Sequence, residues 1–175
     1  WYDSRGREVL VESVGAKDVQ TSIQTTYDAK GRQHRIVTKE GDLSFTENFT
    51  YDQRGRVSRD ENVGRNTTTY SYGNRSVTTT LGTGRSYTKA YNAWGDVVSA
   101  SDPVNTVTWQ YGKNGKPTGV STCGNTVGFG YDDVGNRTSL SDPDAGATTY
   151  TYDAAGRETL RKDARGKTVA TDFDV

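Results

Sequence analysis

The sequence has few residues that carry chemistry and few that build a thick hydrophobic core. With one Cys, one His and no Met, it can form neither an internal disulfide nor a metal cluster built from cysteine or histidine. Leu, Ile, Val and Phe supply only 28 of the 175 residues, which is below the level of roughly 20 % where disorder becomes a serious alternative. However, 11 Tyr, 3 Trp and many Thr favour strands. We therefore expect an ordered β structure that something other than a two-sided core organises.

The charge balance and the hydropathy pattern exclude two classes of partner. The 22 basic and 22 acidic residues cancel, so the chain lacks the positive field that binds nucleic acid, and we expect no nucleic-acid partner. No apolar run approaches the roughly 18 residues of a transmembrane helix, and we expect no membrane span in this segment. The first residues, Trp1-Tyr2-Asp3-Ser4-Arg5-Gly6, are not a charged and then apolar leader. A soluble segment from the interior of a longer protein is expected.

The dominant feature is an internal repeat with the core Tyr-Asp-x-x-Gly-Arg. Four copies are complete: Tyr2-Asp3-Ser4-Arg5-Gly6-Arg7, Tyr27-Asp28-Ala29-Lys30-Gly31-Arg32, Tyr51-Asp52-Gln53-Arg54-Gly55-Arg56 and Tyr152-Asp153-Ala154-Ala155-Gly156-Arg157. Looser copies are Tyr91-Asn92-Ala93-Trp94-Gly95-Asp96, Tyr111-Gly112-Lys113-Asn114-Gly115-Lys116 and Tyr131-Asp132-Asp133-Val134-Gly135-Asn136. Tyr72-Gly73-Asn74-Arg75 is a shortened copy without the downstream Gly, and Phe173-Asp174 opens a truncated one. The leading aromatic residues recur every 19 to 25 positions.

A period of about 21 residues has room for two short strands and two turns, so each repeat is predicted to be a β-hairpin. Asp at the first position and Gly at the fourth favour a type I turn, because the carboxylate caps nearby amides and the Gly accepts a positive φ. Second turns are predicted at Asp163-Ala164-Arg165-Gly166, Asp102-Pro103-Val104-Asn105 and Ser121-Thr122-Cys123-Gly124. No helical periodicity and no linker interrupts this pattern. Residues 1–175 are therefore predicted to be one all-β array of about eight hairpin repeats.

Between the turns, apolar and polar residues alternate with period two. Phe45, Phe49 and Tyr51 share one face, as do Phe129 and Tyr131, while Thr and Ser fill the other. Since the aromatic residues have the same offset in every repeat, we expect neighbouring hairpins to stack them across strands. One face is thus predicted to be an aromatic ladder and the other to be polar and hydrated.

These motifs strongly resemble the YD repeats, also called Rhs repeats. The resemblance rests on the Tyr-Asp-x-x-Gly-Arg core, its spacing, and the approach seen in Thr68-Thr69-Tyr70-Ser71-Tyr72 and Thr148-Thr149-Tyr150-Thr151-Tyr152, and it covers essentially the whole chain. It implies that the hairpins join into a long antiparallel strip that spirals into a hollow shell. In bacterial polymorphic toxins and insecticidal toxin complexes, such a shell encloses a toxic C-terminal polypeptide. Such shells usually need several hundred residues, and the resemblance therefore implies that this chain is an excerpt.

The chain departs from the family in one respect that bears on chemistry. The family's core segment carries an Asp-Pro-x-Gly-Leu signature with self-cleaving aspartates. Asp142-Pro143-Asp144-Ala145-Gly146 and Asp102-Pro103-Val104-Asn105-Thr106 do not match that signature and are interpreted as ordinary turns. No autoproteolysis is therefore expected of any residue here.

The remaining candidate site residues favour structural roles. His34 is predicted to be a surface or inter-strand residue, and Cys123 a turn residue without a neighbouring base. A catalytic carboxylate pair is needed only once, whereas the motif Asp recurs in repeat after repeat, which indicates turn capping. No catalytic residue, metal or cofactor is predicted, and the chain is not expected to be an enzyme.

Two functions remain open at this point. The first is a structural segment of a secreted or exported bacterial shell protein, whose partners are the rest of the parent protein and the enclosed toxin. The second is a cell-surface adhesion or carbohydrate-binding module, because stacked Tyr and Trp can also form a platform for sugar rings. Exposed edge strands are further expected to favour edge-to-edge self-association.

Overall fold

The computed structural model describes residues 1–14, 19–64 and 66–174, and these residues form only strands and turns. No helix that could span a bilayer occurs in the described part of the chain. The chain divides into two compact units, residues 1–87 and 88–175, which are described separately. Whether the two act as one continuous array, as the sequence predicts, stays a prediction.

Residues 1–87 form a sheet in which each strand pairs antiparallel with the next in the chain. Its strands are β1 (Leu10–Val14), β2 (Gln20–Tyr27), β3 (Gln33–Glu40), β4 (Leu43–Tyr51), β5 (Val57–Asn62), β6 (Asn66–Gly73) and β7 (Ser76–Leu81). The next strand, β8 (Ser86–Tyr91), begins at the end of this unit. This is the arrangement of consecutive hairpins that the repeat predicts.

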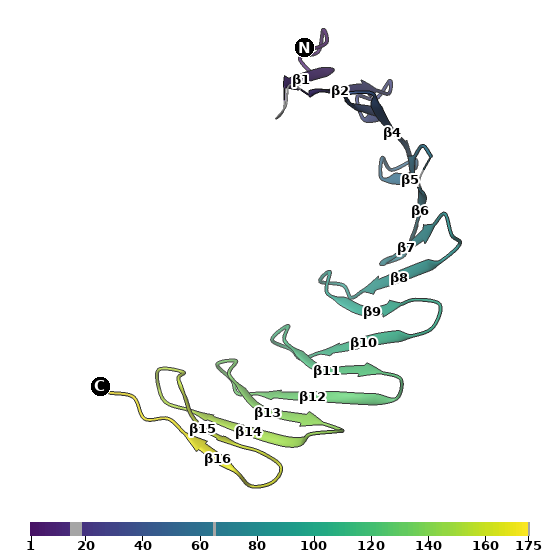
Figure 1. Cartoon of the computed structure of the whole chain (residues 1–175). Coiled ribbons are helices and arrows are strands. Elements are labelled where there is room, and N and C mark those ends of the chain that lie inside the picture. The colour runs from purple at the N-terminus through teal and green to yellow at the C-terminus, as the bar shows by residue number, and fades with distance from the viewer. Residues whose placement is uncertain (15–18, 65, 175) are drawn as a thin grey trace. The chain divides into compact units, whose positions relative to one another are not determined.

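Residues 88–175 repeat the same arrangement. β8 pairs with β9 (Val97–Ser101), which is followed in order by β10 (Thr106–Tyr111), β11 (Pro117–Thr122), β12 (Asn125–Tyr131), β13 (Arg137–Asp142), β14 (Gly146–Tyr152), β15 (Glu158–Lys162) and β16 (Thr168–Ala170). Strands β9 to β15 lie side by side in chain order (Figure 1). The all-β, antiparallel hairpin fold predicted from the sequence is confirmed.

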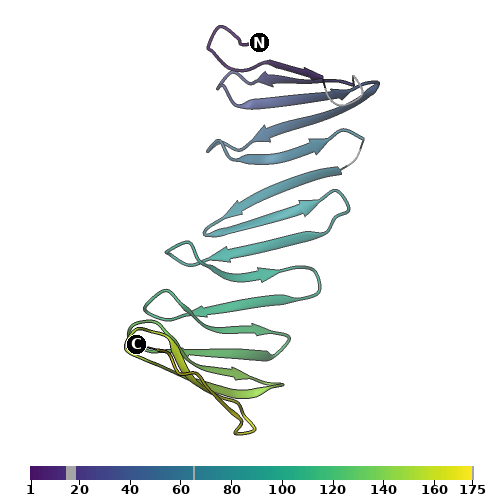
Figure 2. The same cartoon turned by 60° about the vertical axis from the view of Figure 1, so that its left-hand side comes forward.

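The motif forms the turn that its residues predict. The Asp28 amide donates to the Arg32 carbonyl (2.8 Å) and the Gly31 amide donates to the Asp28 carbonyl (2.9 Å), with Gly31 at a φ of 83°. This is a three-residue hairpin loop in which a type I turn is followed by a left-handed residue, and Gly adopts that conformation without strain. The same two bonds close the turns that begin at Asp3, Asp52, Asn92, Gly112, Asp132 and Asp153. In residues 88–175, the turns after β8, β10 and β12 lie at one end of the strands, and those after β9, β11 and β13 lie at the other end (Figure 2).

Two turns differ from the prediction. The turn after β11 spans Thr122 to Asn125, one residue later than predicted, with Cys123 at a φ of 50° and Gly124 at 84°. Two consecutive positive φ values match the twist of the flanking strands, which is why such two-residue turns close hairpins. The shortened copy closes between Gly73 and Ser76, and Arg75 takes a positive φ of 56° in place of the missing Gly.

In six repeats the strand after the motif turn has a β-bulge opposite the motif Tyr, and the sequence analysis did not anticipate it. In the second repeat, Thr26 pairs with Arg35 whereas Tyr27 pairs with Gln33, so His34 is an extra residue on β3. The same shift occurs next to Tyr51, Tyr91, Tyr111, Tyr131 and Tyr152. Because a bulge bends the strand that contains it and increases the local twist, the strand after each of these motif turns is bent opposite the Tyr.

Burial is sparse, as the low aliphatic content indicates. Tyr150 is the only large hydrophobic residue below 9 % exposure among those described, and none of them has a fully buried side chain. Each sheet is thus held by its backbone ladder and by contacts between neighbouring strands rather than by a second layer packed over it.

Candidate functional site: the clamp between repeats

Each complete motif fixes its own Arg side chain. Asp28 Oδ1 accepts the amide protons of Lys30 and Arg32, both at 2.9 Å. Asp28 Oδ2 accepts from Arg32 Nε at 2.7 Å and lies 2.6 Å from Nη2. This two-point contact matches the planar fork of the guanidinium to the carboxylate, so one Asp holds both the turn and the Arg.

The Arg held in this way contacts the Tyr of the next motif. The Arg32 guanidinium carbon lies 4.1 Å from the centre of the Tyr51 ring, a distance typical of a cation–π interaction. The Tyr51 hydroxyl in turn donates to the backbone carbonyl of Gln33, the residue after Arg32, at 2.5 Å. We name this arrangement the inter-repeat clamp: the Asp and Arg of one motif, and the Tyr of the next.

The inter-repeat clamp recurs wherever a complete motif precedes an aromatic residue. The guanidinium-to-ring distance is 4.2 Å for Arg7 over Tyr27 and 3.9 Å for Arg56 over Tyr72. Both rings also donate a hydroxyl proton to the preceding repeat, Tyr27 to the Glu8 carbonyl and Tyr72 to the Val57 carbonyl, each at 2.7 Å. The last complete motif places Arg157 at 4.5 Å over Phe173, which has no hydroxyl to donate.

The contact over the ring that follows each complete motif therefore differs from the one predicted. The sequence favoured aromatic rings stacked on aromatic rings, because the rings share one offset in every repeat. The structure instead places a guanidinium over the ring, since the negative ring face attracts a cation and the Asp neutralises that cation. Only the Asp–Arg pairing was signalled by the sequence, because every complete copy has Arg four residues after its Asp.

The motif Gly has a second role besides its positive φ. Arg7 Nη1 lies beneath the next turn, where a Cβ added at Gly31 would come within 3.3 Å of it. Arg32 Nη1 similarly lies 3.7 Å from a Cβ added at Gly55. Both Nη1 atoms are buried without a hydrogen-bond partner, which fits a guanidinium lying flat between a ring and a turn. Gly31 thus leaves room for the Arg of the preceding repeat, whereas the distance at Gly55 is that of an ordinary van der Waals contact.

The ionisation states suit this geometry. The Arg7 side chain and backbone amide lower the pKa of Asp3 from 3.8 to about 2. Hydrogen bonds from Arg32 and Arg157, the backbone amide first in each case, lower the pKa of Asp28 and Asp153. Burial raises the pKa of the Tyr51 hydroxyl. The Asp is therefore charged and the Tyr protonated at neutral pH, as the clamp requires.

All three looser copies replace the Arg, and two of them keep the hydroxyl bond from the next ring. Tyr111 donates to the Val97 carbonyl at 2.9 Å and Tyr152 to the Arg137 carbonyl at 2.8 Å. In the Tyr131 copy, Asn136 replaces the Arg and its side-chain amide donates to Asp132 Oδ2 at 3.0 Å. In the Tyr111 copy, Lys116 replaces the Arg and lies 5.4 Å from the centre of the next ring.

The two residues that sequence reasoning set aside, His34 and Cys123, are both exposed. His34 is exposed at the bulge, with Nδ1 3.2 Å from the Phe49 carbonyl. Cys123 is exposed, and its Sγ lies 2.7 Å from Asn105 Oδ1. A search of residues 1–14, 19–64 and 66–174 finds no group of three potential metal ligands.

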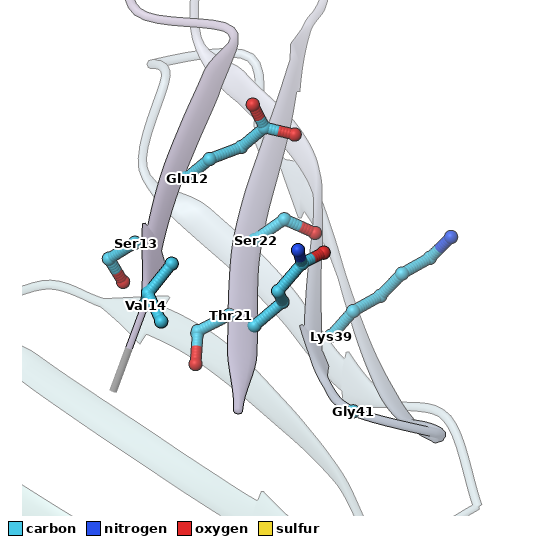
Figure 3. Close-up of a pocket in the computed structure, with 8 residues that line it drawn as sticks. Glu12, Ser13, Val14, Thr21, Ser22, Lys39 and Gly41 are labelled. Carbon is cyan, nitrogen blue, oxygen red and sulfur yellow. The ribbon is translucent and has the colours of Figure 1, made fainter. Parts of the chain in front are cut away.

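A hollow of about 530 Å³ lies over strands β1 to β3. Figure 3 shows that the Glu12 carboxylate and the Lys39 ammonium on its walls extend from different strands and do not meet. The remaining wall residues are small or uncharged, among them Ser13, Thr21 and Ser22. The hollow thus lacks the converging charged groups that acid–base chemistry needs.

Comparisons with known proteins agree with this architecture. The family described as Teneurin YD-shell matches residues 1–110, and the family described as RHS Repeat matches residues 131–168. A search of curated proteins gives no match. The crystal structure of TcdB2-TccC3-Cdc42 aligns with a TM-score of 0.60 and 15 % identity over 83 % of this chain. That of TcdB2-TccC3 aligns with a TM-score of 0.60 and 14 % identity over 81 %.

At 15 % and 14 % identity, these matches show a shared fold and no more. Each alignment covers 9 % of the other chain. This chain therefore spans about a tenth of the length of the solved chains that it matches. The family match is more extensive, because the YD-shell family accounts for residues 1–110 of the 175. With the Tyr-Asp motif, the antiparallel hairpins and the recurrent clamp already described, the chain belongs to the YD-shell family of YD/Rhs-repeat proteins.

Proposed function

We propose that this chain is a non-enzymatic piece of the wall of a hollow β-shell, which encloses a toxic C-terminal polypeptide and delivers it. The observation that carries the proposal is the inter-repeat clamp. It uses the most polar residues of each motif, Asp and Arg, to fasten one hairpin to the next. A binding or catalytic site would need such residues once, whereas the clamp recurs after all four complete motifs, as a wall built from repeats requires.

The mechanism is geometric. Backbone ladders join neighbouring strands, the motif turns set the hairpin length, and the clamp fixes each repeat against the next. Because the charge of Arg32 is neutralised by Asp28 and covered by Tyr51, the joint leaves no unpaired cation for a passing polypeptide to bind. Membership of the YD-shell family supports a structural role, and the partners are then the rest of the parent protein and its enclosed polypeptide.

The location follows from the same proposal. Proteins of the Rhs type that the sequence resembles are exported by bacteria, so we place the parent protein outside the cell or at its surface. The lone His and the lone Cys, His34 and Cys123, are both exposed, which fits a wall better than a catalytic centre.

Limited proteolysis of the full parent polypeptide tests enclosure. The protein is digested with and without urea, and the surviving fragments are identified by intact mass. A C-terminal fragment that resists digestion natively and is cut only once the repeats unfold supports the shell. The control is the same fragment expressed alone, which should be cut without urea. Free cleavage of everything outside the repeats contradicts enclosure.

A second candidate is an adhesion or carbohydrate-binding module at a cell surface. It is favoured by the match of residues 1–110 to the family described as Teneurin YD-shell and by Trp94, whose side chain is 88 % exposed. Glycan arrays probed with the chain test it. Binding to one class of glycan that Trp94→Ala abolishes supports adhesion, and an array without binding removes it.

A further inference from the structure

Two loose copies of the inter-repeat clamp have no cation at the Arg position, although the ring that would receive it is present: Asn136 stands there in the copy that begins at Tyr131, and the second is the copy that begins at Tyr91. In the motif that begins at Tyr91, Asp96 occupies the position of the Arg. The next motif ring, Tyr111, still donates its hydroxyl to the Val97 carbonyl at 2.9 Å, so the ring is held as in the complete clamps. Among residues 66–174, no cation lies over this ring, whereas Arg or Lys lies over the motif rings at Tyr72, Tyr131 and Phe173.

A hollow of about 560 Å³ lies beside the Tyr111 ring, where the complete clamps have an Arg side chain over the ring. Its walls include Trp94, Asp96 and Tyr111. The volume lies in the range of small-ligand sites. Trp94 is the most exposed large hydrophobic residue described, at 88 %, and it lies in a turn where the other complete or loose copies have Arg, Lys, Asn, Val or Ala.

The local hydrogen bonds hold the walls in place. Asn92 Oδ1 accepts the amide protons of Trp94 and Asp96, both at 2.9 Å. The Asn92 side-chain amide donates to Asp96 Oδ2 at 2.9 Å, which fixes the carboxylate beside the ring. The result is two aromatic groups and a half-buried carboxylate around one open space.

We propose that this hollow binds the side chain of an arginine carried by a peptide segment that is not part of residues 66–174. The choice of ligand rests on the chain itself. In the complete clamps a guanidinium fills the equivalent space, flat on a Tyr ring and paired with an Asp carboxylate. The Tyr111 site offers the same ring, adds an indole, and supplies its carboxylate from position 96.

Charge in the hollow bears on how tightly it binds. Asp96 attracts a cation, whereas Lys113, which also lines the hollow, repels it. Planar, weakly hydrated guanidinium stacks on aromatic faces better than a compact ammonium does. A guanidinium should therefore bind in preference to a lysine side chain, and removal of the Lys113 charge should strengthen binding.

The test uses the full chain and NMR titration of its amide and indole N–H signals. The probe is N-acetyl-arginine methylamide, and the matched neutral probe is N-acetyl-citrulline methylamide, which has nearly the same shape without the charge. We expect the arginine probe to shift the Trp94 indole signal and to bind at least tenfold more tightly than the citrulline probe. Equal binding of the two probes overturns the proposal.

Variants separate the site from the fold. Trp94→Ala and Tyr111→Leu should each weaken binding at least about two- to fivefold, which is the change in affinity expected from the loss of an exposed cation–π contact. Tyr111→Phe keeps the ring and should keep the binding. Asp96→Asn should also weaken it. The pair Asn92→Asp and Asp96→Arg rebuilds the complete motif and should abolish binding by filling the hollow.

Two further results contradict the proposal. One is binding that survives the rebuilt motif. The other is a shift of the same Trp94 signal by neutral oligosaccharides but not by the arginine probe, which assigns the hollow to sugar instead. Neither result depends on whether the parent protein encloses a polypeptide, so the shell proposal and this one succeed or fail separately.

Discussion

The contact between Arg32 and Tyr51 allows a quantitative test of the inter-repeat clamp. The change is a double-mutant cycle with Arg32→Gln and Tyr51→Leu, made singly and together. Each single change also removes other bonds, because Arg32 pairs with Asp28 and the Tyr51 hydroxyl bonds to the Gln33 carbonyl. The cycle cancels those losses and leaves the coupling between the two side chains.

The structure sets the size of that coupling. Cation–π pairs contribute about 0.5–1 kcal/mol when exposed and about 2 kcal/mol when desolvated. The Arg32 side chain is 27 % exposed and one of its nitrogens is fully buried, so the site lies between these limits. We therefore expect a coupling of about 1–1.5 kcal/mol, favourable in sign.

Hydrogen exchange followed by mass spectrometry is the suitable assay. Repeat arrays need not unfold in one step, so a single unfolding midpoint would average over local transitions. The free energies of exchange of the β4 and β5 amides report the joint directly. The control pairs Tyr51→Leu with Lys30→Gln, an exposed residue of the same turn as Arg32. A coupling no larger than that of the control refutes the clamp as an energetic link.

Three further predictions follow from the same geometry. Tyr51→Phe keeps the ring and removes one hydroxyl bond, and should destabilise the β4 and β5 amides by about 0.5–1.5 kcal/mol in hydrogen exchange; no change would mean that water replaces the bond fully. Gly31→Ala should lower the free energies of exchange of the β2 and β3 amides more than Gly166→Ala lowers those of β15 and β16, because both Gly have a φ above 80° but only an alanine at 31 brings a Cβ to 3.3 Å from Arg7; equal effects would remove the second role of Gly31. The pKa of Asp3 is lowered from 3.8 to about 2, so its contribution to stability is complete above about pH 4 and is lost as the pH falls toward about 2, and thermal melts should show this decline less steeply in Asp3→Asn.

The hairpin fold could be predicted because its signals are local. Asp28 and Gly31 specify a turn within four residues, and the Gly31 φ of 83° is the conformation that such a turn requires. Strand alternation and a period of about 21 residues then give antiparallel hairpins. The predicted boundary of the turn at Cys123 was wrong for the converse reason. No local signal indicates that a Cys would adopt a φ of 50°.

The clamp and the bulges could not be read in the same way. Arg32 and Tyr51 are 19 residues apart, and their contact depends on the register between strands rather than on either motif. His34 is an extra residue only because Tyr27 pairs with Gln33, and no residue near His34 in the sequence indicates a bulge. The absence of a cation over Tyr111 could be interpreted only by comparison with the complete clamps, in which an Arg lies over the ring.

The structure of the full parent protein, determined by electron cryomicroscopy, tests the shell proposal most directly. We expect residues 1–175 to lie in the wall of a closed hollow, with the Arg32 guanidinium over the Tyr51 ring and density for a polypeptide inside. An open strip with solvent on both faces and no enclosed density would contradict the proposal.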